Sequence, residues 1–265
     1  MNSQKVLITG GNSGIGLAIS NLFLDRGFQV FSASRNDREY PKHKNFHYSR
    51  LDLCDLGAVS EFGRCFIQEH GVPDILINNA GYGAFFEWRA FEEDQIIQQA
   101  NVLFIAPSLL CRTFAPAMAK KKKGTIMNIT SLATLFPLPY MPLYNSSKTA
   151  LSALTSSLML EYEKFPRFMD FRLGDVRTDF NKFSLQQLNS SQPTRMKAAW
   201  SQIEKQLGES PTAKIVAGQI LTAYKRKKQG IVYGGSFLHA TIAPIVYKIL
   251  GQKGLRFLLH KRYFG

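Results

Sequence analysis

The chain has 265 residues, of which 45% are hydrophobic and 20% charged, a composition that excludes a largely disordered protein and predicts a folded domain with a sizeable core. Its 33 Lys and Arg against 19 Asp and Glu give a formal charge of +14, which favours anionic partners: a phosphorylated cofactor, an acidic lipid surface or nucleic acid. Three scattered cysteines without C-x-x-C spacing argue against a disulfide framework and a structural zinc site, and we expect no bound metal.

The apolar segment at residues 6–8 is too short for the hydrophobic core of a secretory signal. No uninterrupted apolar stretch approaches the roughly 20 residues that span a bilayer. We therefore expect a cytoplasmic protein that is soluble or at most peripheral at a membrane surface.

Short apolar segments alternate with segments of helical periodicity from residue 5 to about residue 235. Strands are predicted at 6–8, 29–33, 47–51, 74–77, 124–129, 168–173 and 231–233. Helices are predicted from the first Gly-rich turn to about 26, at 55–69, at 91–118 with an interruption near Pro107, and at 143–164. Continuous apolar strands joined by helices indicate one α/β domain, residues 1–235, with a doubly wound, mainly parallel, Rossmann-like sheet of seven strands flanked by helices.

A glycine-rich loop, Thr9-Gly10-Gly11-Asn12-Ser13-Gly14-Ile15-Gly16, lies between the first strand and the first helix. Glycines at 10, 14 and 16 allow a tight turn and a close approach of the backbone to a pyrophosphate. The start of the helix directs free N–H groups and the positive end of its dipole at such an anion. A plain βα turn would also be rich in glycine, so the loop needs further support.

The pair Tyr144 and Lys148 opens the helix at 143–164 with a spacing of four residues, which places both side chains on one helix face. A nearby ammonium is expected to lower the pKa of the phenol from its usual value of about 10 and make Tyr144 a general acid and base. On its own this spacing is weak evidence, because it occurs by chance on many surface helices.

Together, the T-G-x-x-x-G-x-G loop, Asn78-Asn79-Ala80-Gly81, Ser131 and Tyr144-x-x-x-Lys148 resemble the short-chain dehydrogenase/reductase family over residues 4–235. The resemblance implies that Asn101, Ser131, Tyr144 and Lys148 are catalytic. In such a site Ser131 orients the substrate carbonyl, Tyr144 exchanges a proton, Lys148 holds the nicotinamide ribose, and Asn101 supports a water relay. A helix-bending role for Asn101 stays open.

The resemblance also implies a dinucleotide site. Its expected residues are Gly10, Asn12, Ser13, Gly14, Ile15, Gly16, Ser34, Arg35, Asp52, Asn79, Ala80, Gly81, Tyr144, Lys148, Val176 and Thr178. Ser34 stands where NAD-dependent relatives place Asp, and the planar guanidinium of Arg35 suits a 2′-phosphate, so we expect NADP(H) rather than NAD(H), with Arg38 assisting. For Asn79 a structural role is as well supported as cofactor contact.

The expected function is reduction of a carbonyl to an alcohol, or the reverse, on a hydrophobic or lipid-like molecule. Leu135, Phe136, Leu138, Pro139, Tyr140 and Met141 would form an apolar wall, Asp175 would contribute to specificity, and residues 180–207 would act as a mobile lid. A catalytically idle NADP(H) sensor is the alternative. No nucleic-acid reading motif is present, and a homodimer or homotetramer is expected from the resemblance.

The segment 236–265 lies beyond the region of resemblance and is predicted to be a basic, amphipathic, helical extension. Its apolar residues alternate with Lys and Arg, a pattern that suits an anionic membrane interface. Packing over the substrate pocket or at a subunit contact would use the same pattern, and the sequence leaves the three open.

Overall fold

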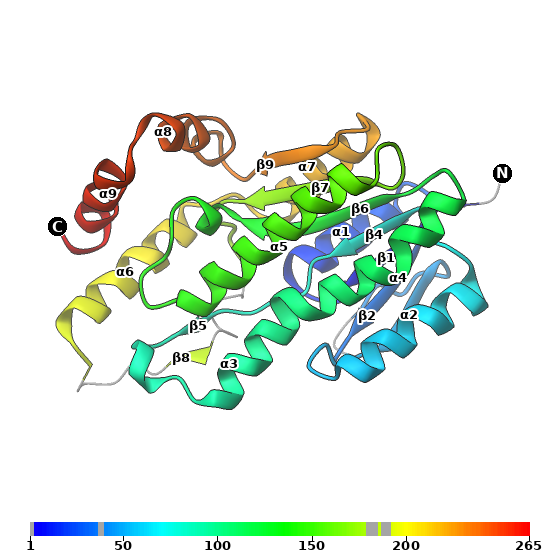
Figure 1. Ribbon diagram of the computed structural model, residues 1–265, viewed down its shortest axis with the longest axis horizontal. Coiled ribbons are helices and arrows are strands. Elements are labelled where there is room, and N and C mark those ends of the chain that lie inside the picture. Colours follow the sequence, from blue (N-terminus) through cyan, green and yellow to red (C-terminus); the bar gives the residue numbers. More distant parts are fainter. Residues whose placement is uncertain (1–2, 37–39, 179–184, 187–191) are drawn as a thin grey trace.

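Seven parallel strands form one sheet in the order β3-β2-β1-β4-β6-β7-β9, in a computed structural model that describes residues 3–36, 40–178, 185–186 and 192–265 (Figure 1). The strands are β1 (Lys5–Thr9), β2 (Gln29–Ser34), β3 (Phe46–Arg50), β4 (Ile75–Asn78), β6 (Thr125–Ser131), β7 (Arg167–Leu173) and β9 (Gly230–Gly234). The order reverses between β1 and β4, and open α/β sheets bind ligands at such a switch point. The predicted doubly wound sheet is confirmed.

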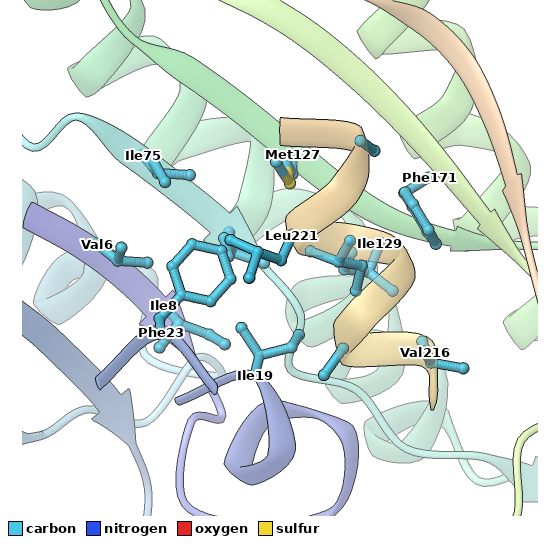
Figure 2. Close-up of a cluster of buried hydrophobic side chains, with 14 of the residues drawn as sticks. Val6, Ile8, Ile19, Phe23, Ile75, Met127, Ile129, Phe171, Val216 and Leu221 are labelled. Carbon is cyan, nitrogen blue, oxygen red and sulfur yellow. The ribbon is translucent and has the colours of Figure 1, made fainter. Parts of the chain in front are cut away.

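Helices cover both faces of this sheet, as the apolar strands require. The helices α1 (Gly14–Leu24) and α7 (Ala213–Lys225) pack on one face, where Figure 2 shows their side chains meeting those of the strands. The other face is covered by α2 (Leu56–His70), α4 (Ala106–Lys120) and α5 (Pro142–Glu161). Along β1, Val6 and Ile8 belong to the first cluster and Leu7 to the second, so consecutive residues stabilise opposite layers.

A π-helical turn, η2 (Asn101–Ile105), joins α3 (Glu93–Ala100) to α4 and produces the interruption predicted near Pro107. Pro107 has no N–H, and its ring would clash with the carbonyl four residues back in a regular helix. The wider turn accommodates it, and the amide of Ala106 donates to the carbonyl of Asn101.

The continuous helical stretch Glu93–Lys120 is long and apolar enough, by length and composition, to cross a membrane. No apolar segment of that length was predicted from the sequence. Its side chains Leu110, Phe114 and Met118 are fully buried against the sheet. A buried core helix can have the same length and apolar composition as a membrane-spanning helix.

Several short or distal elements were not predicted individually. A second, two-stranded sheet pairs β5 (Ala84–Phe85) with β8 (Leu185–Gln186), and short 3-10 turns occur at η1 (Trp88–Ala90) and η3 (Leu132–Thr134). The helix α6 (Thr194–Gly208) follows, and the predicted extension consists of the π turn η4 (Leu238–Ile242), α8 (Ala243–Ile249) and α9 (Gln252–Phe264). Figure 1 shows α8 and α9 at the periphery of the molecule, outside the sheet, and α9 packs on α6.

Candidate active site

The glycine-rich loop has the geometry of a phosphate cradle at the carboxyl end of β1. Gly10 and Gly14 have φ of 68° and 50°, a region that favours glycine, and α1 begins at Gly14. A Cβ on Gly16 would lie 1.9 Å from the carbonyl oxygen of Gly10. The loop therefore closes tightly on the helix start, where N–H groups are free to bind an anion.

Thr9 and Asn79 hold the loop to the segment after β4. The Thr9 hydroxyl accepts hydrogen bonds from the amides of Asn79 (3.0 Å) and Ala80 (3.1 Å). The Asn79 side-chain amide donates to the carbonyls of Thr9 (3.0 Å) and Gly10 (3.3 Å). Asn79 thus has a structural role and also lines the cavity described below.

The end of β2 supplies a buried hydroxyl and an exposed cation to the same region. Ser34 is 7% exposed, whereas Arg35 is exposed at the cavity wall. Asp52, after β3, lines the wall beside them, and its carboxylate accepts from the amide of Cys54 at 2.9 Å. Arg38, the expected assisting cation, lies outside the described residues.

Three reactive side chains meet where β6 ends and α5 begins. Ser131 is the last residue of β6, and its hydroxyl shares a hydrogen bond with Tyr144. Tyr144 and Lys148 lie in the first two turns of α5, with the Lys148 ammonium 6.0 Å from the centroid of the Tyr144 ring. Lys148 is 4% exposed and donates to the carbonyl of Ile129 at 2.7 Å.

The electrostatics of this pair differ from the expectation. Burial raises the pKa of Tyr144, an effect that the Asp175 carboxylate reinforces and the Ser131 hydrogen bond opposes. Burial also lowers the pKa of Lys148 to about 8, although Asp170 acts in the opposite direction. The Lys148 ammonium is directed at the Ile129 carbonyl and is itself desolvated. The pKa of the Tyr144 phenol is therefore set mainly by its own loss of water and not by the neighbouring charge. Tyr144 is accordingly held protonated near neutral pH, the form that can donate a proton.

A single cavity of about 940 Å³ connects the glycine-rich loop with these side chains. It is lined by Ser131 and by every residue expected to bind the cofactor: Gly10, Asn12, Ser13, Gly14, Ile15, Gly16, Ser34, Arg35, Asp52, Asn79, Ala80, Gly81, Tyr144, Lys148, Val176 and Thr178. Within the described residues, no group of three His, Cys, Asp or Glu side chains could hold a metal ion.

Asn101 is not among the residues that line the cavity. Its side-chain amide donates to the carbonyl of Cys54 at 3.3 Å, and its own carbonyl closes the π turn. The structure thus places Asn101 in the helix irregularity, and its relay role stays a prediction.

The far end of the cavity is mainly apolar. Leu138 and Met141 of the predicted wall line it. Tyr140 instead packs on Phe85, and Phe136 packs on Tyr247 of the extension, with ring centroids 5.3 Å and 5.8 Å apart. Of the predicted lid, residues 180–184 and 187–191 lie outside the described part of the chain, and 194–207 belong to α6.

Four further residues also line the cavity. Ile203 and Leu207 of α6 line the cavity, as do Tyr82, directly after the Asn-Asn-Ala-Gly segment, and Gln98. Ile203 and Leu207 belong to the segment 180–207 that was predicted to cover the site, whereas nothing in the sequence pointed to Tyr82 or Gln98.

Asp175 connects the cavity to the C-terminal extension. It lines the cavity, and its carboxylate lies 3.6 Å from the Nε2 atom of His239 in η4 and 4.0 Å from the guanidinium of Arg262 in α9. The His239 ring occupies the space that a side chain at Gly174 would need. These contacts join residues more than 60 positions apart, and no spacing rule predicts them.

Comparisons with known proteins agree with this geometry. The family model of the short chain dehydrogenases matches residues 4–189. A 3-ketodihydrosphingosine reductase of Bacteroides thetaiotaomicron is 31% identical over 184 residues, which cover 68% of this chain and 66% of that protein, just under two thirds of its length.

Two solved structures show the cofactor types found among similar proteins. A 4-hydroxyisoleucine dehydrogenase complexed with NADH is 26% identical with a TM-score of 0.74, over 87% of this chain and 96% of that one. A metagenomic short-chain oxidoreductase in complex with NADP is 28% identical with a TM-score of 0.58, over 65% and 81%. Fold, site and sequence agree: this chain belongs to the short-chain dehydrogenase family, oxidoreductases that act on CH–OH and C=O groups.

Proposed function

We propose that this protein is an NADPH-dependent reductase of a carbonyl group on a hydrophobic, lipid-like substrate, working in either direction as conditions dictate. The observation that carries the proposal is the meeting of Ser131, Tyr144 and Lys148 in the cavity that also contains the glycine-rich loop. A proton donor beside a dinucleotide cradle is the arrangement that carbonyl reduction requires.

The residues present fit a nicotinamide dinucleotide. The cradle leaves no room for a Cβ at Gly16, and the free N–H groups of α1 suit the pyrophosphate. Asp52 would hold the adenosine end, while Lys148, Val176 and Thr178 would hold the nicotinamide end. When bound, the reduced cofactor supplies the hydride.

The side chains around the carbonyl would act as follows. The hydroxyls of Ser131 and Tyr144, already hydrogen-bonded to each other, would both donate to the carbonyl oxygen of the substrate. Tyr144, protonated near neutral pH, would transfer its proton to that oxygen as negative charge develops. Lys148 would hold the nicotinamide ribose, and Asn101 would support resupply of the proton through water.

Preference for NADPH is supported by the end of β2. Ser34 leaves room and no charge where a carboxylate would repel a 2′-phosphate, and the exposed guanidinium of Arg35 lies at the cavity wall. Similar proteins bind NADP or NADH, so this preference depends on these two residues.

A lipid-like substrate is supported by the apolar far end of the cavity, lined by Leu138, Met141, Ile203 and Leu207. The name of the Bacteroides relative also indicates reduction of a 3-keto group. We further propose a homodimer or homotetramer, as is usual in the family.

The test is a panel of ketones and aldehydes of increasing chain length, with NADPH and NADH, followed through the absorbance of the reduced nicotinamide. We expect kcat/KM to rise with chain length and to be higher with NADPH. Each buried methylene should contribute up to about 0.8 kcal/mol, close to fourfold per carbon. Equal rates for short and long ketones would contradict the lipid-like substrate.

A further inference from the structure

The C-terminal extension carries an exposed apolar surface that the active site does not use. Eight of the fourteen exposed large hydrophobic side chains in the described part of the chain lie between residues 237 and 258. Four of them, Leu238, Ile242, Ile245 and Ile249, recur at helical spacing along η4 and α8 and are 53%, 39%, 53% and 79% exposed. We name these four residues the apolar stripe.

The charges around the stripe have one sign. Between residues 236 and 265 the chain has five Lys and Arg residues and no Asp or Glu. Lys248, Lys253, Arg256 and Lys261 are all exposed on α8 and α9. Phe257, 72% exposed, lies among them. The surface therefore combines apolar side chains with uncompensated positive charge.

The inner side of the extension is fixed to the protein. Tyr263 is 5% exposed in a cluster with Met141 and Trp200, and Arg262 donates to Gln206 at 2.6 Å. The Arg195 guanidinium lies 4.1 Å from the centroid of the Phe264 ring. On α8, Tyr247 packs on Phe136. The four stripe residues are exposed on η4 and α8, and Figure 1 shows α8 at the periphery of the molecule.

We propose that the apolar stripe and its surrounding cations dock this protein in the interface of an anionic membrane, with α8 lying in the membrane plane. The apolar helix Leu238–Ile249 is roughly 18 Å long at 1.5 Å per residue, too short for a hydrocarbon core of about 30 Å. An interfacial position buries its apolar face and leaves the cations at the level of the lipid phosphates.

A second copy of this chain is the competing occupant, and charge disfavours it. A two-fold contact through the stripe would bring the same surface of both copies together. The four exposed cations of each segment would then come together with no carboxylate of either segment to pair them. Anionic lipid headgroups instead match this charge.

The test is co-sedimentation of the purified full-length protein with vesicles of phosphatidylcholine alone or mixed with phosphatidylglycerol. We expect strong binding to the mixed vesicles, at least tenfold weaker binding to neutral ones, and loss of binding as salt is raised. No substrate is needed, so failure here leaves the proposed reaction untouched, and failure of the reaction leaves this result untouched.

Two double variants separate the apolar from the charged contribution. Ile245→Ser with Ile249→Ser, and Lys253→Gln with Arg256→Gln, should each weaken binding to mixed vesicles about tenfold or more. The matched control is Ile97→Ser with Leu160→Ser, two exposed apolar residues elsewhere (57% and 86%), which should leave binding unchanged.

Three outcomes would overturn the proposal. They are equal binding to neutral and anionic vesicles, unchanged binding in both double variants, and absence of vesicle binding together with a dimer that the Ile245/Ile249 variant dissociates. Should the stripe variant fail to fold, as judged by its thermal unfolding, the charge variant and the salt dependence decide the question.

Discussion

At the scale of single residues, the proposed preference for NADPH depends mainly on Arg35. It is exposed at the cavity wall, so its guanidinium is free to meet a 2′-phosphate with paired, charge-assisted hydrogen bonds. Hydrogen bonds to charged groups contribute about 1.5–3 kcal/mol. Arg35→Asp should therefore weaken NADPH binding by roughly 10- to 100-fold and leave NADH binding nearly unchanged, measured by fluorescence titration.

The matched control for this variant is Arg226→Asp, an exposed cation at the end of α7 that does not line the cavity and undergoes the same change of charge. It should alter the affinity for both cofactors little. Equal weakening of NADPH binding in the two variants would mean that the overall positive field, and not a contact of Arg35, selects the phosphate.

Lys148 gives a second residue-scale prediction, on the pH dependence of stability. Burial lowers its pKa from 10.5 to about 8, so between these values the unfolded chain binds more protons than the folded one. The free energy of unfolding therefore rises with pH across that window, by on the order of 3 kcal/mol. Below about pH 8 the full cost of burying the charged ammonium is present.

Lys148→Met should remove this dependence. The wild-type free energy of unfolding minus that of the variant should grow between about pH 8 and pH 10, in urea unfolding followed by circular dichroism. Lys148→Met also removes the hydrogen bond to Ile129, so the test depends on how the difference changes with pH and not on its size. A difference that stays constant with pH would show that Lys148 is not desolvated in the folded protein.

At the scale of elements, the turn from β1 into α1 allows no side chain at Gly16. A Cβ there would lie 1.9 Å from the backbone oxygen of Gly10, and backbone cannot move aside as a flexible side chain can. Gly16→Ala should displace the loop, reduce NADPH affinity more than tenfold and lower the melting temperature.

Gly218→Ala is the control for this substitution. Gly218 lies inside α7 with nothing within 4 Å of its would-be Cβ, so alanine should stabilise the protein by about 0.5–1 kcal/mol and leave cofactor binding intact. If Gly16→Ala bound NADPH as well as Gly218→Ala does, the loop would not be the cradle.

The helices and strands differ in how well the sequence predicts them. The central strands β1, β4 and β6 were predictable because their apolar runs are buried on both faces, whereas β3 has no fully buried residue and gave a weaker pattern. Pro107 marked the helix irregularity. β5 and β8 have two residues each, too few for any periodicity to appear. Tyr140 and Phe136 lie in the predicted apolar wall, yet they pack on Phe85 and Tyr247 because tertiary neighbours decide which way each side chain points.

At the scale of the whole molecule, the site is completed by contacts that no local pattern encodes. Loop segments at 10–16 and 79–81 were predicted because each has its own signature after a strand, and Val176 and Thr178 were predicted from the family resemblance. The contacts of Asp175 with His239 and Arg262 depend on how the extension folds back. Desolvation of Tyr144 is likewise a property of the assembled cavity, which is why the spacing of Tyr144 and Lys148 predicted the opposite pKa direction.

The central proposal for the whole molecule is that the partly buried Tyr144 phenol, which lines the cavity, donates the proton to a substrate carbonyl. The decisive measurement is the oxidation of NADPH by a long-chain ketone, compared between the wild-type protein and Tyr144→Phe, with NADPH affinity determined for both. Loss of a positioned general acid should lower kcat by about 10²–10⁴-fold while the affinity for NADPH stays within a factor of two or so. A Tyr144→Phe variant that turns over at the wild-type rate would contradict the account.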